Sequence, residues 1–261
     1  MGGTDRKGFR VAAAGGRADA LHVGVVLPVH NEEHHLPDAL RCLDRAIGQV
    51  TDDGIDCRLA VVLDDCSDAS SEIVDHWLDH RTGPAPVDVV RICSKNVGVA
   101  RRTGCAALLD RWPSAPVDAI WLATTDADSE VPGDWLTAQL RARAEGAHIW
   151  VGRVQVRSWS DRLEGTADEW QRRYAREPVP VHGANFGVDA AMYLDAGGFD
   201  GLATGEDRDL LDRVLGRGAV ARTDGTVRVI TSGRRQARAP RGFAHALSGI
   251  EDTLPVAAAA S

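Results

Sequence analysis

The sequence predicts an α/β protein with a Rossmann-like, mostly parallel sheet flanked by helices. Three observations support this. Short apolar runs alternate with helix-length amphipathic segments up to about residue 157. Polar, mostly acidic residues follow the apolar runs, as they do at the carboxyl ends of strands in such sheets. The chain has 261 residues, 44% of them hydrophobic, which is enough for one domain with a large core.

Each element is predicted from its own pattern of apolar residues. Helical spacing places Leu36, Leu40, Leu43 and Ile47 on one stripe, which is typical of a helix that packs against a core. The predicted strands are 21–29, 58–64, 87–93, 119–125 and 149–156. The helices predicted between them are 33–49, 69–80, 98–112 and 133–145.

The second half of the chain is less regular. A polar helix over 160–176 and a Pro-rich turn, "REPVPVHG", are followed by helices near 188–195 and over 206–217. No internal repeat or low-complexity linker divides the chain. We therefore expect a single domain over residues 21–247, with a flexible leader over 1–20 and a flexible tail over 248–261.

Composition argues against several classes of protein. The net charge is -8 and no block of Lys or Arg stands out, so nucleic acid is not the expected partner. The five cysteines form no CxxC pair and are odd in number, which indicates reduced thiols in a cytoplasmic protein. No segment approaches the roughly 18 apolar residues of a membrane span, so we predict no integral membrane segment.

The stretch "TTDADSE" follows the fourth predicted strand and contains Asp126 and Asp128. In an extended chain, residues two apart lie on the same side, so these like charges need a positive partner. The first three strands end in "PVHNEE", "DDCSDAS" and "SKNVGVARRTG". Asp and Asn are common in turns and at helix N-termini, so each segment alone has a structural explanation. Their convergence at one edge of the sheet favours a binding site.

The motifs, taken in order, resemble those of family 2 glycosyltransferases of the GT-A fold. The residues that carry the resemblance run from about 23 to 217: "VGVVLPVHNEEHHLPDAL", "VVLDDCSDASSEIV", "KNVGVARRTGCA", "TTDADSEVPGDWL" and "GGFDGLATGEDRDLLDRV". The resemblance implies a nucleoside-diphosphate sugar donor, an acceptor hydroxyl, a divalent cation and, usually, inversion at the anomeric carbon.

The resemblance also implies roles for residues at the first three strand ends. The nucleoside would lie among Pro28, His30, Asn31 and Glu32, where His30 replaces the more usual Tyr. Asp65 would accept a hydrogen bond from the base, or Asp64 if the register shifts by one.

For the diphosphate, the resemblance places Lys95 and Arg101 near the ribose and phosphates, with Gly98 allowing the backbone to approach. Because a carboxylate can accept the N3–H of uracil, we expect a UDP-sugar in preference to a GDP-sugar.

Asp126 and Asp128 match the DxD motif of these enzymes. The resemblance implies that Asp128 binds Mg²⁺ or Mn²⁺ directly and that Asp126 contacts the ribose or a metal-bound water. Mg²⁺ takes only one or two carboxylates and completes its shell with phosphates and water, so the cation would arrive with the donor. The alternative is an acidic turn that caps the helix beginning near Pro132.

Glu206 and Asp207 match the family's ED motif, in which the Asp is the general base that deprotonates the acceptor hydroxyl. A sugar hydroxyl is a poor nucleophile at neutral pH, so a positioned carboxylate is useful there. Acidic residues also stabilise the first turn of a helix, and both interpretations can hold together.

Several other residues have only weak signals. His182 and His245 are candidates for a third metal ligand or an acceptor contact, although a lone His is more often structural. Trp159 and Trp170, eleven positions apart on a predicted helix, could stack on a sugar or pack in the core. Four arginines in the C-terminal segment form either a lid over the diphosphate or a solvated basic strip: Arg234, Arg235, Arg238 and Arg241.

Three other functions stay open at this point. A retaining transferase of the same fold would share the DxD motif. A phosphatase of the haloacid dehalogenase type also uses DxD, but after its first strand and with a downstream Lys, and no Lys follows Lys95 here. A non-catalytic, nucleotide-binding relative is the third alternative. "LPVHNEE" contains no Gly, which argues against a nucleotidyltransferase or a dinucleotide-binding dehydrogenase.

Overall fold

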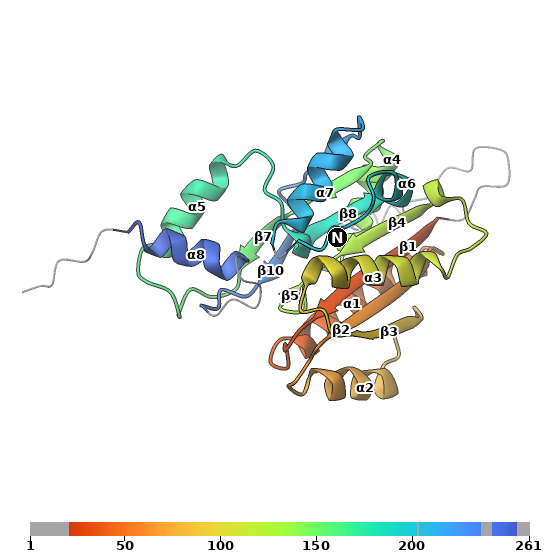
Figure 1. The fold of residues 1–261 in the computed structure, drawn as a ribbon, viewed down its shortest axis with the longest axis horizontal. Coiled ribbons are helices and arrows are strands. Elements are labelled where there is room, and N and C mark those ends of the chain that lie inside the picture. Colours follow the sequence, from red (N-terminus) through yellow and green to blue (C-terminus); the bar gives the residue numbers. More distant parts are fainter. Residues whose placement is uncertain (1–20, 203, 236–241, 255–261) are drawn as a thin grey trace, which may run out of the picture.

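A central sheet organises the fold. The computed structural model describes residues 21–202, 204–235 and 242–254, and within these ranges seven strands form the sheet in the order β3-β2-β1-β4-β8-β6-β9 (Figure 1). The strands are β1 (His22–Val29), β2 (Asp56–Asp64), β3 (Val87–Ile92), β4 (Ile120–Thr124), β6 (Ile149–Val151), β8 (Phe186–Asp189) and β9 (Ala221–Arg222). Strands β1 to β4 are mutually parallel, whereas β8 runs antiparallel between β4 and β6.

The order of strands creates a switch point beside β1. The chain proceeds outward from β1 to β2 and β3, and then returns to place β4 on the opposite side of β1. The loops that leave the carboxyl ends of β1 and β4 therefore diverge at this point. Ligands bind at such positions in open α/β sheets.

Helices cover both faces of the sheet. On one face lie α1 (Leu36–Asp52), α2 (Ser70–His80) and α4 (Trp135–Ala144), and on the other lie α3 (Val97–Leu109), α6 (Ala190–Asp195) and α7 (Glu206–Leu215). The predicted stripe of α1 is confirmed, because Leu36, Leu40, Leu43 and Ile47 are all fully buried. Two cores thus hold the sheet between layers of helices.

The predicted strand over 149–156 is wrong as a single element. It divides at Gly152 into β6 and β7 (Arg153–Val156), and β7 joins a second sheet with β5 (Ser129–Glu130) and β10 (Arg228–Thr231). The backbone N–H of Gly152 donates to the Asn185 carbonyl at 2.8 Å, and a Cβ on Gly152 would lie 2.1 Å from Asn185 Nδ2. The buried Asn185 carboxamide therefore occupies the space that a side chain at position 152 would need, so only glycine fits where the two strands separate.

The C-terminal half also departs from the prediction. The helix expected over 160–176 begins only at Thr166, as α5 (Thr166–Arg176), so Trp159 precedes it. An unpredicted helix, α8 (Phe243–Glu251), packs beside α5 at one end of the molecule (Figure 1). The proposed tail boundary at residue 248 falls inside α8, where Ile250 and Glu251 are buried. Residues 1–20 and 255–261 lie outside the described residues.

None of the described helices is both long enough and apolar enough to span a membrane.

Candidate functional site

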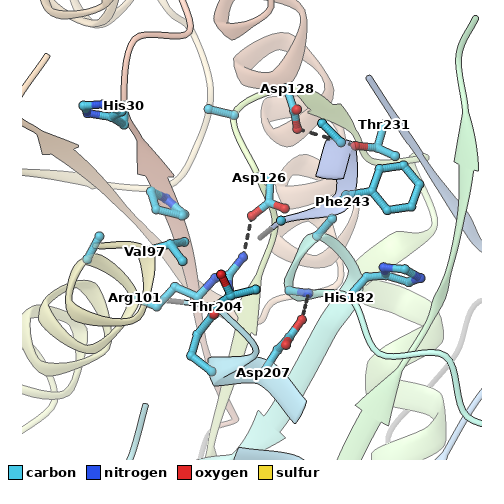
Figure 2. Close-up of a pocket in the computed structure, with 18 of the residues that line it drawn as sticks. His30, Val97, Arg101, Asp126, Asp128, His182, Thr204, Asp207, Thr231 and Phe243 are labelled. Carbon is cyan, nitrogen blue, oxygen red and sulfur yellow. Dashed lines mark hydrogen bonds and ion pairs between the residues drawn. The ribbon is translucent and has the colours of Figure 1, made fainter. Parts of the chain in front are cut away.

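A cavity of about 450 Å³ opens at the carboxyl ends of β1, β2 and β4 and extends between α3, α7 and the start of α8. Figure 2 shows part of its lining, with Arg101, Asp126, Asp128 and Asp207 directed toward a common space. Ten of the thirteen residues to which the resemblance gives roles line this cavity: Pro28, His30, Glu32, Asp64, Lys95, Arg101, Asp126, Asp128, Glu206 and Asp207. His182 and Arg234, which had weaker signals, line it too. The structure thus brings together the ends of four strands, β1 to β4, and a distant helix.

Arg101 connects the two acidic motifs. It is buried on α3, its Nη2 lies 2.5 Å from Asp126 Oδ1, and its Nη1 donates to Glu206 (Figure 2). Gly183 makes room for this guanidinium, because a Cβ there would lie 2.1 Å from Arg101 Nη2. Burial alone would lower the pKa of Arg101, but the neighbouring carboxylates outweigh burial and raise it. Asp126 therefore has a permanent positive partner.

A second arginine pairs with Asp128. Arg234 lies between two carboxylates, with Nη1 2.6 Å from Glu32 Oε2 and Nη2 3.1 Å from Asp128 Oδ2. Ser129 Oγ donates to the other Asp128 oxygen at 3.1 Å, and Thr231 Oγ1 lies 3.5 Å from that oxygen (Figure 2). Burial raises the pKa of Asp128 to about 6 in spite of Arg234. The sequence named Arg234 only as part of a basic segment, and nothing in that pattern indicates this partner.

The acidic groups can be compared with what a divalent cation needs. Among the described residues, no three His, Cys, Asp or Glu side chains gather into a ligand cluster. Mg²⁺ needs only one or two carboxylates when phosphates complete its shell. Asp128 meets that need, since its carboxylate is buried and lines the cavity. The oxygen ligands that the protein offers therefore fit a cation that also binds a diphosphate, provided that Arg234 releases Asp128.

Asp207 lies on the opposite side of the cavity from the strand ends. Its Oδ2 accepts a hydrogen bond from the Gly183 backbone N–H at 2.7 Å, and its Oδ1 accepts one from the Arg208 N–H at 2.8 Å (Figure 2). Glu206, by contrast, is buried against Arg101; burial raises its pKa, and Arg101 opposes that shift. Asp207 is thus the more accessible carboxylate of the pair.

The loops after β2 and β3 are joined through Asp64. Its buried carboxylate accepts from the N–H groups of Ser94, Lys95 and Asn96 and from the Ser94 hydroxyl, at 2.6 to 2.9 Å. Burial opposes ionisation, but these donors outweigh it and lower the pKa of Asp64. Asp65 forms an ion pair with Lys95 at 2.9 Å and does not line the cavity. Asp64 therefore holds the loop after β3 in place, whereas Asp65 lies outside the cavity lining.

Two further predicted residues lie outside the lining. Asn31 uses its side-chain oxygen to accept from the Ser67 N–H at 2.7 Å, which ties the β1 loop to the β2 loop. Gly98 has a different close neighbour from the one expected: a Cβ there would lie 2.1 Å from the Asp200 carbonyl oxygen. Gly98 therefore lets α3 approach the loop before α7.

The loops also carry unusual backbone conformations. Asn31, Asp65 and Lys95 have positive φ angles of 56°, 50° and 50°, and each lies just after β1, β2 or β3. Non-glycine residues adopt this region rarely, and such residues cluster at functional sites.

His182 lines the cavity and belongs to an aromatic cluster with Tyr174 and Phe243. Its ring lies 5.6 Å from the Tyr174 ring and 5.7 Å from the Phe243 ring, and its Nε2 is buried with no hydrogen-bond partner. Burial lowers the pKa of His182 to about 4, although Asp207 and Asp126 oppose the shift. Figure 2 shows His182 and Phe243 together on one side of the cavity.

His245 and the two tryptophans do not line the cavity. His245 is exposed on α8 and does not line it. The rings of Trp159 and Trp170 lie 5.6 Å apart, and Trp170 stacks on Tyr174. The two tryptophans therefore extend the aromatic cluster of His182, Tyr174 and Phe243. Arg238 and Arg241 lie outside the described residues.

Some lining residues had no recognisable signal in the sequence. Val154, Thr231 and Phe243 reach the cavity from β7, β10 and α8. The first of these was expected inside a continuous strand, and the other two fall in segments for which no element was predicted. Only the packing of the second sheet and α8 places them there.

The fold is similar to those of several solved glycosyltransferases. TarS 1–349 from S. aureus aligns with a TM-score of 0.57 and 13% identity, over 82% of this chain and 61% of that chain. The mannosyltransferase PcManGT from Pyrobaculum calidifontis, in complex with GDP-Man and Mn²⁺, aligns with a TM-score of 0.57 and 18% identity, over 83% and 58%. GalNAc-T7 with UDP, GalNAc and Mn²⁺ gives 0.61 and 15%, over 83% and 45%.

These likenesses confirm the predicted GT-A fold, and at such identities they show the fold alone. The chain spans about three fifths of the length of TarS 1–349. No curated protein matches it in sequence. The model of "Glycosyl transferase family 2" matches residues 24–192. This range includes most of β1, all of β2 to β4 and both aspartates of the DxD segment, and it ends before Glu206. The chain therefore belongs to glycosyl transferase family 2.

Proposed function

We propose that this protein transfers a sugar from a nucleoside-diphosphate sugar to an acceptor hydroxyl, with inversion at the anomeric carbon. One observation carries the proposal. A single cavity at the switch point of the sheet holds two sets of carboxylates, Asp126 with Asp128 and Glu206 with Asp207, joined by the buried Arg101. Family membership supports the same reaction class.

Asp207 is the proposed general base. Two backbone N–H groups fix its carboxylate, and the side chain lines the cavity, so an acceptor hydroxyl can approach it there. Deprotonation at Asp207 makes that oxygen a better nucleophile as it attacks the anomeric carbon. Glu206 is held by Arg101, which suits it to positioning Arg101 rather than to accepting a proton.

Asp126 and Asp128 are the proposed donor side of the cavity. Asp128 would hold Mg²⁺ or Mn²⁺, and Asp126 would orient the ribose or a water on the ion. When bound, the ion neutralises the charge that develops on the departing diphosphate. Arg101 adds a fixed positive charge 2.5 Å from Asp126. PcManGT and GalNAc-T7 were both solved with Mn²⁺, which supports this assignment.

The nucleoside is proposed to lie against the ends of β1 and β2. Pro28, His30 and Asp64 line that part of the cavity, and the His30 ring is fixed by a 2.6 Å hydrogen bond between Nδ1 and the Asp64 carbonyl. We infer a preference for UDP over GDP because a carboxylate accepts the N3–H of uracil. Asp65, paired with Lys95 at the rim, would have to turn inward to do this.

A nucleotide panel tests the proposal without knowledge of the acceptor. Ligands that bind the native state raise the melting temperature, so UDP, GDP, TDP and CDP are compared with Mn²⁺ or with chelator. We expect the largest Mn²⁺-dependent shift for UDP. In Asp128→Ala, the Mn²⁺-dependent part of this shift should disappear while the shift with chelator is not reduced. A larger shift with GDP would contradict the uridine preference alone.

The same panel separates the alternative functions. A phosphatase or a protein that binds no nucleotide would show no shift with any of the four. A non-catalytic module would show the shift but would neither hydrolyse nor transfer sugar from the donor. A retaining transferase would show both the thermal shift and sugar transfer. The anomeric configuration of its product, measured by NMR, would identify it.

A further inference from the structure

Arg234 occupies the place opposite Asp128. Its guanidinium spans two carboxylates that come from the ends of different strands, Glu32 after β1 and Asp128 after β4. The Glu32 and Asp128 side chains are only 7% and 14% exposed, so water screens their charges poorly. Two buried carboxylates without a cation would repel each other, and each would lose hydration without compensation. Arg234 supplies the positive charge in the structure.

The backbone that carries Arg234 is held in place independently. Arg162, whose side chain is fully buried, donates from Nε to the Gly233 carbonyl at 2.8 Å and from Nη2 to the Arg234 carbonyl. Arg162 itself lies 3.5 Å from Glu251 of α8. Gly233 fits closely, since a Cβ there would lie 2.2 Å from the Ser158 carbonyl oxygen. With its backbone held in this way, Arg234 can leave Asp128 by rotation of its side chain.

We propose that Arg234 and a divalent cation compete for Asp128, and that the donor's diphosphate binds Arg234 and so frees Asp128 for the cation. The inference rests on the proposed function, because it assumes that Asp128 is the carboxylate that holds the cation. A guanidinium binds phosphate oxygens in a bidentate manner, and Arg234 lines the same cavity. The cation thus binds tightly only together with the nucleotide, and Arg234 becomes a ligand of the diphosphate.

The test measures the binding of Mn²⁺ alone, by the EPR signal of the free ion or by calorimetry. Arg234→Gln removes the competing charge, so its affinity for Mn²⁺ should exceed that of the original protein by roughly tenfold or more. Arg234→Lys keeps a cation in place and should stay close to the original. Arg235→Gln is the matched control, because Arg235 is more exposed and pairs with Glu251 instead.

A second variant locates the effect. Adding Asp128→Asn to Arg234→Gln should abolish the gain, since the gained affinity acts through that carboxylate. Equal Mn²⁺ affinity in Arg234→Gln and the original protein would overturn the proposal. So would a gain that persists in the double variant, or an equal gain in Arg235→Gln. Thermal melts of each variant establish that it is folded before binding is compared.

The role of the nucleotide is measured separately. Binding of Mn²⁺ and UDP should be coupled, so that saturating UDP raises the Mn²⁺ affinity of the original protein. In Arg234→Gln the increase should be smaller, because no arginine is left to transfer from Asp128 to the diphosphate. An undiminished coupling in that variant would overturn the diphosphate part of the proposal. If none of the nucleotides bound, the proposed function would be contradicted. The competition between Arg234 and Mn²⁺ would still be tested by the affinities for Mn²⁺ alone.

Discussion

At the scale of single residues, Asp207 and Glu206 show how neighbours on one helix acquire different chemistry. Asp207 accepts hydrogen bonds from two backbone N–H groups at the cavity surface, whereas Glu206 is buried against Arg101. The sequence "GEDRDLL" presents both as acidic residues in a first helical turn. Their difference depends on Arg101 and Gly183, which lie far away in the chain.

The proposed base leads to a direct test. Asp207→Asn keeps the shape of the side chain but cannot accept a proton, and its amide oxygen can keep only one of the two hydrogen bonds from backbone N–H groups. We expect transfer to fall by about two to four orders of magnitude, with donor and Mn²⁺ binding nearly unchanged. The measurement is turnover of the donor with the best acceptor, beside nucleotide-induced thermal shifts. Near-normal turnover in this variant would remove Asp207 from the mechanism.

His182 makes stability depend on pH. Burial lowers its pKa in the folded protein to about 4, from 6.5 for an ordinary histidine. Between these values the unfolded chain binds the proton and the folded protein does not, so stability is lost as the pH falls through this window. Between pH 7 and pH 5 the loss due to this residue should be between about 1 and 2 kcal/mol.

The measurement compares urea unfolding at the two pH values. His182→Phe keeps a ring beside Tyr174 and Phe243 but cannot titrate, so its free energy of unfolding should fall less between pH 7 and pH 5. His245→Phe, at an exposed position on α8, serves as the control and should behave like the original protein. Identical pH dependence in all three proteins would mean that His182 is hydrated in the folded state.

At the scale of elements, the position of α3 depends on glycine. Gly104 lies against β1, where a Cβ would come within 2.5 Å of Val26, and Gly98 lies against the loop before α7. These contacts bring the helix close enough for Arg101 to reach both Asp126 and Glu206. The resemblance implied that Gly98 allows a close approach to the ligand, and in the structure Gly98 also allows a close approach of the protein's own backbone.

Alanine substitutions test this packing. Gly98→Ala places a Cβ 2.1 Å from the Asp200 carbonyl oxygen, so we expect the free energy of unfolding to fall by about 1 to 3 kcal/mol. Gly48→Ala in α1 is the matched control, because nothing lies within 4 Å of its Cβ. There, better helix propensity should raise stability by about 0.5 to 1 kcal/mol. Urea denaturation midpoints report both changes, and a neutral Gly98→Ala would contradict the close contact.

At the scale of the whole molecule, the cavity joins parts of the chain that periodicity cannot relate. The DxD segment follows β4 of the central sheet, Asp207 begins α7, and Arg234 follows β10 of the second sheet. The switch point beside β1 provides the opening, and α8 with its Phe243 closes the far side. The family match extends only to residue 192, so the portion that carries Glu206, Asp207 and Arg234 lies beyond it.

The sequence by itself determined the parallel core of the sheet, the helices α1 to α4 and the acidic strand ends. These features arise from local patterns, because the period of apolar residues and the turn residues that follow depend only on neighbours in the chain. The amphipathic stripe of α1 is the clearest case. The resemblance of the motifs added the family, and with it the expected roles of Asp126, Asp128 and Asp207.

Only the tertiary structure decided which charges are paired. Arg101 meets Glu206 across 105 positions, and Arg234 meets Glu32 across 202. The same holds for the break at Gly152 between β6 and β7, where the buried carboxamide of Asn185 lies in the space of a side chain at position 152. The physical reason is shared: the stability of a buried ion pair or amide depends on desolvation and on partners brought together by packing, and neither leaves a periodic trace in the sequence.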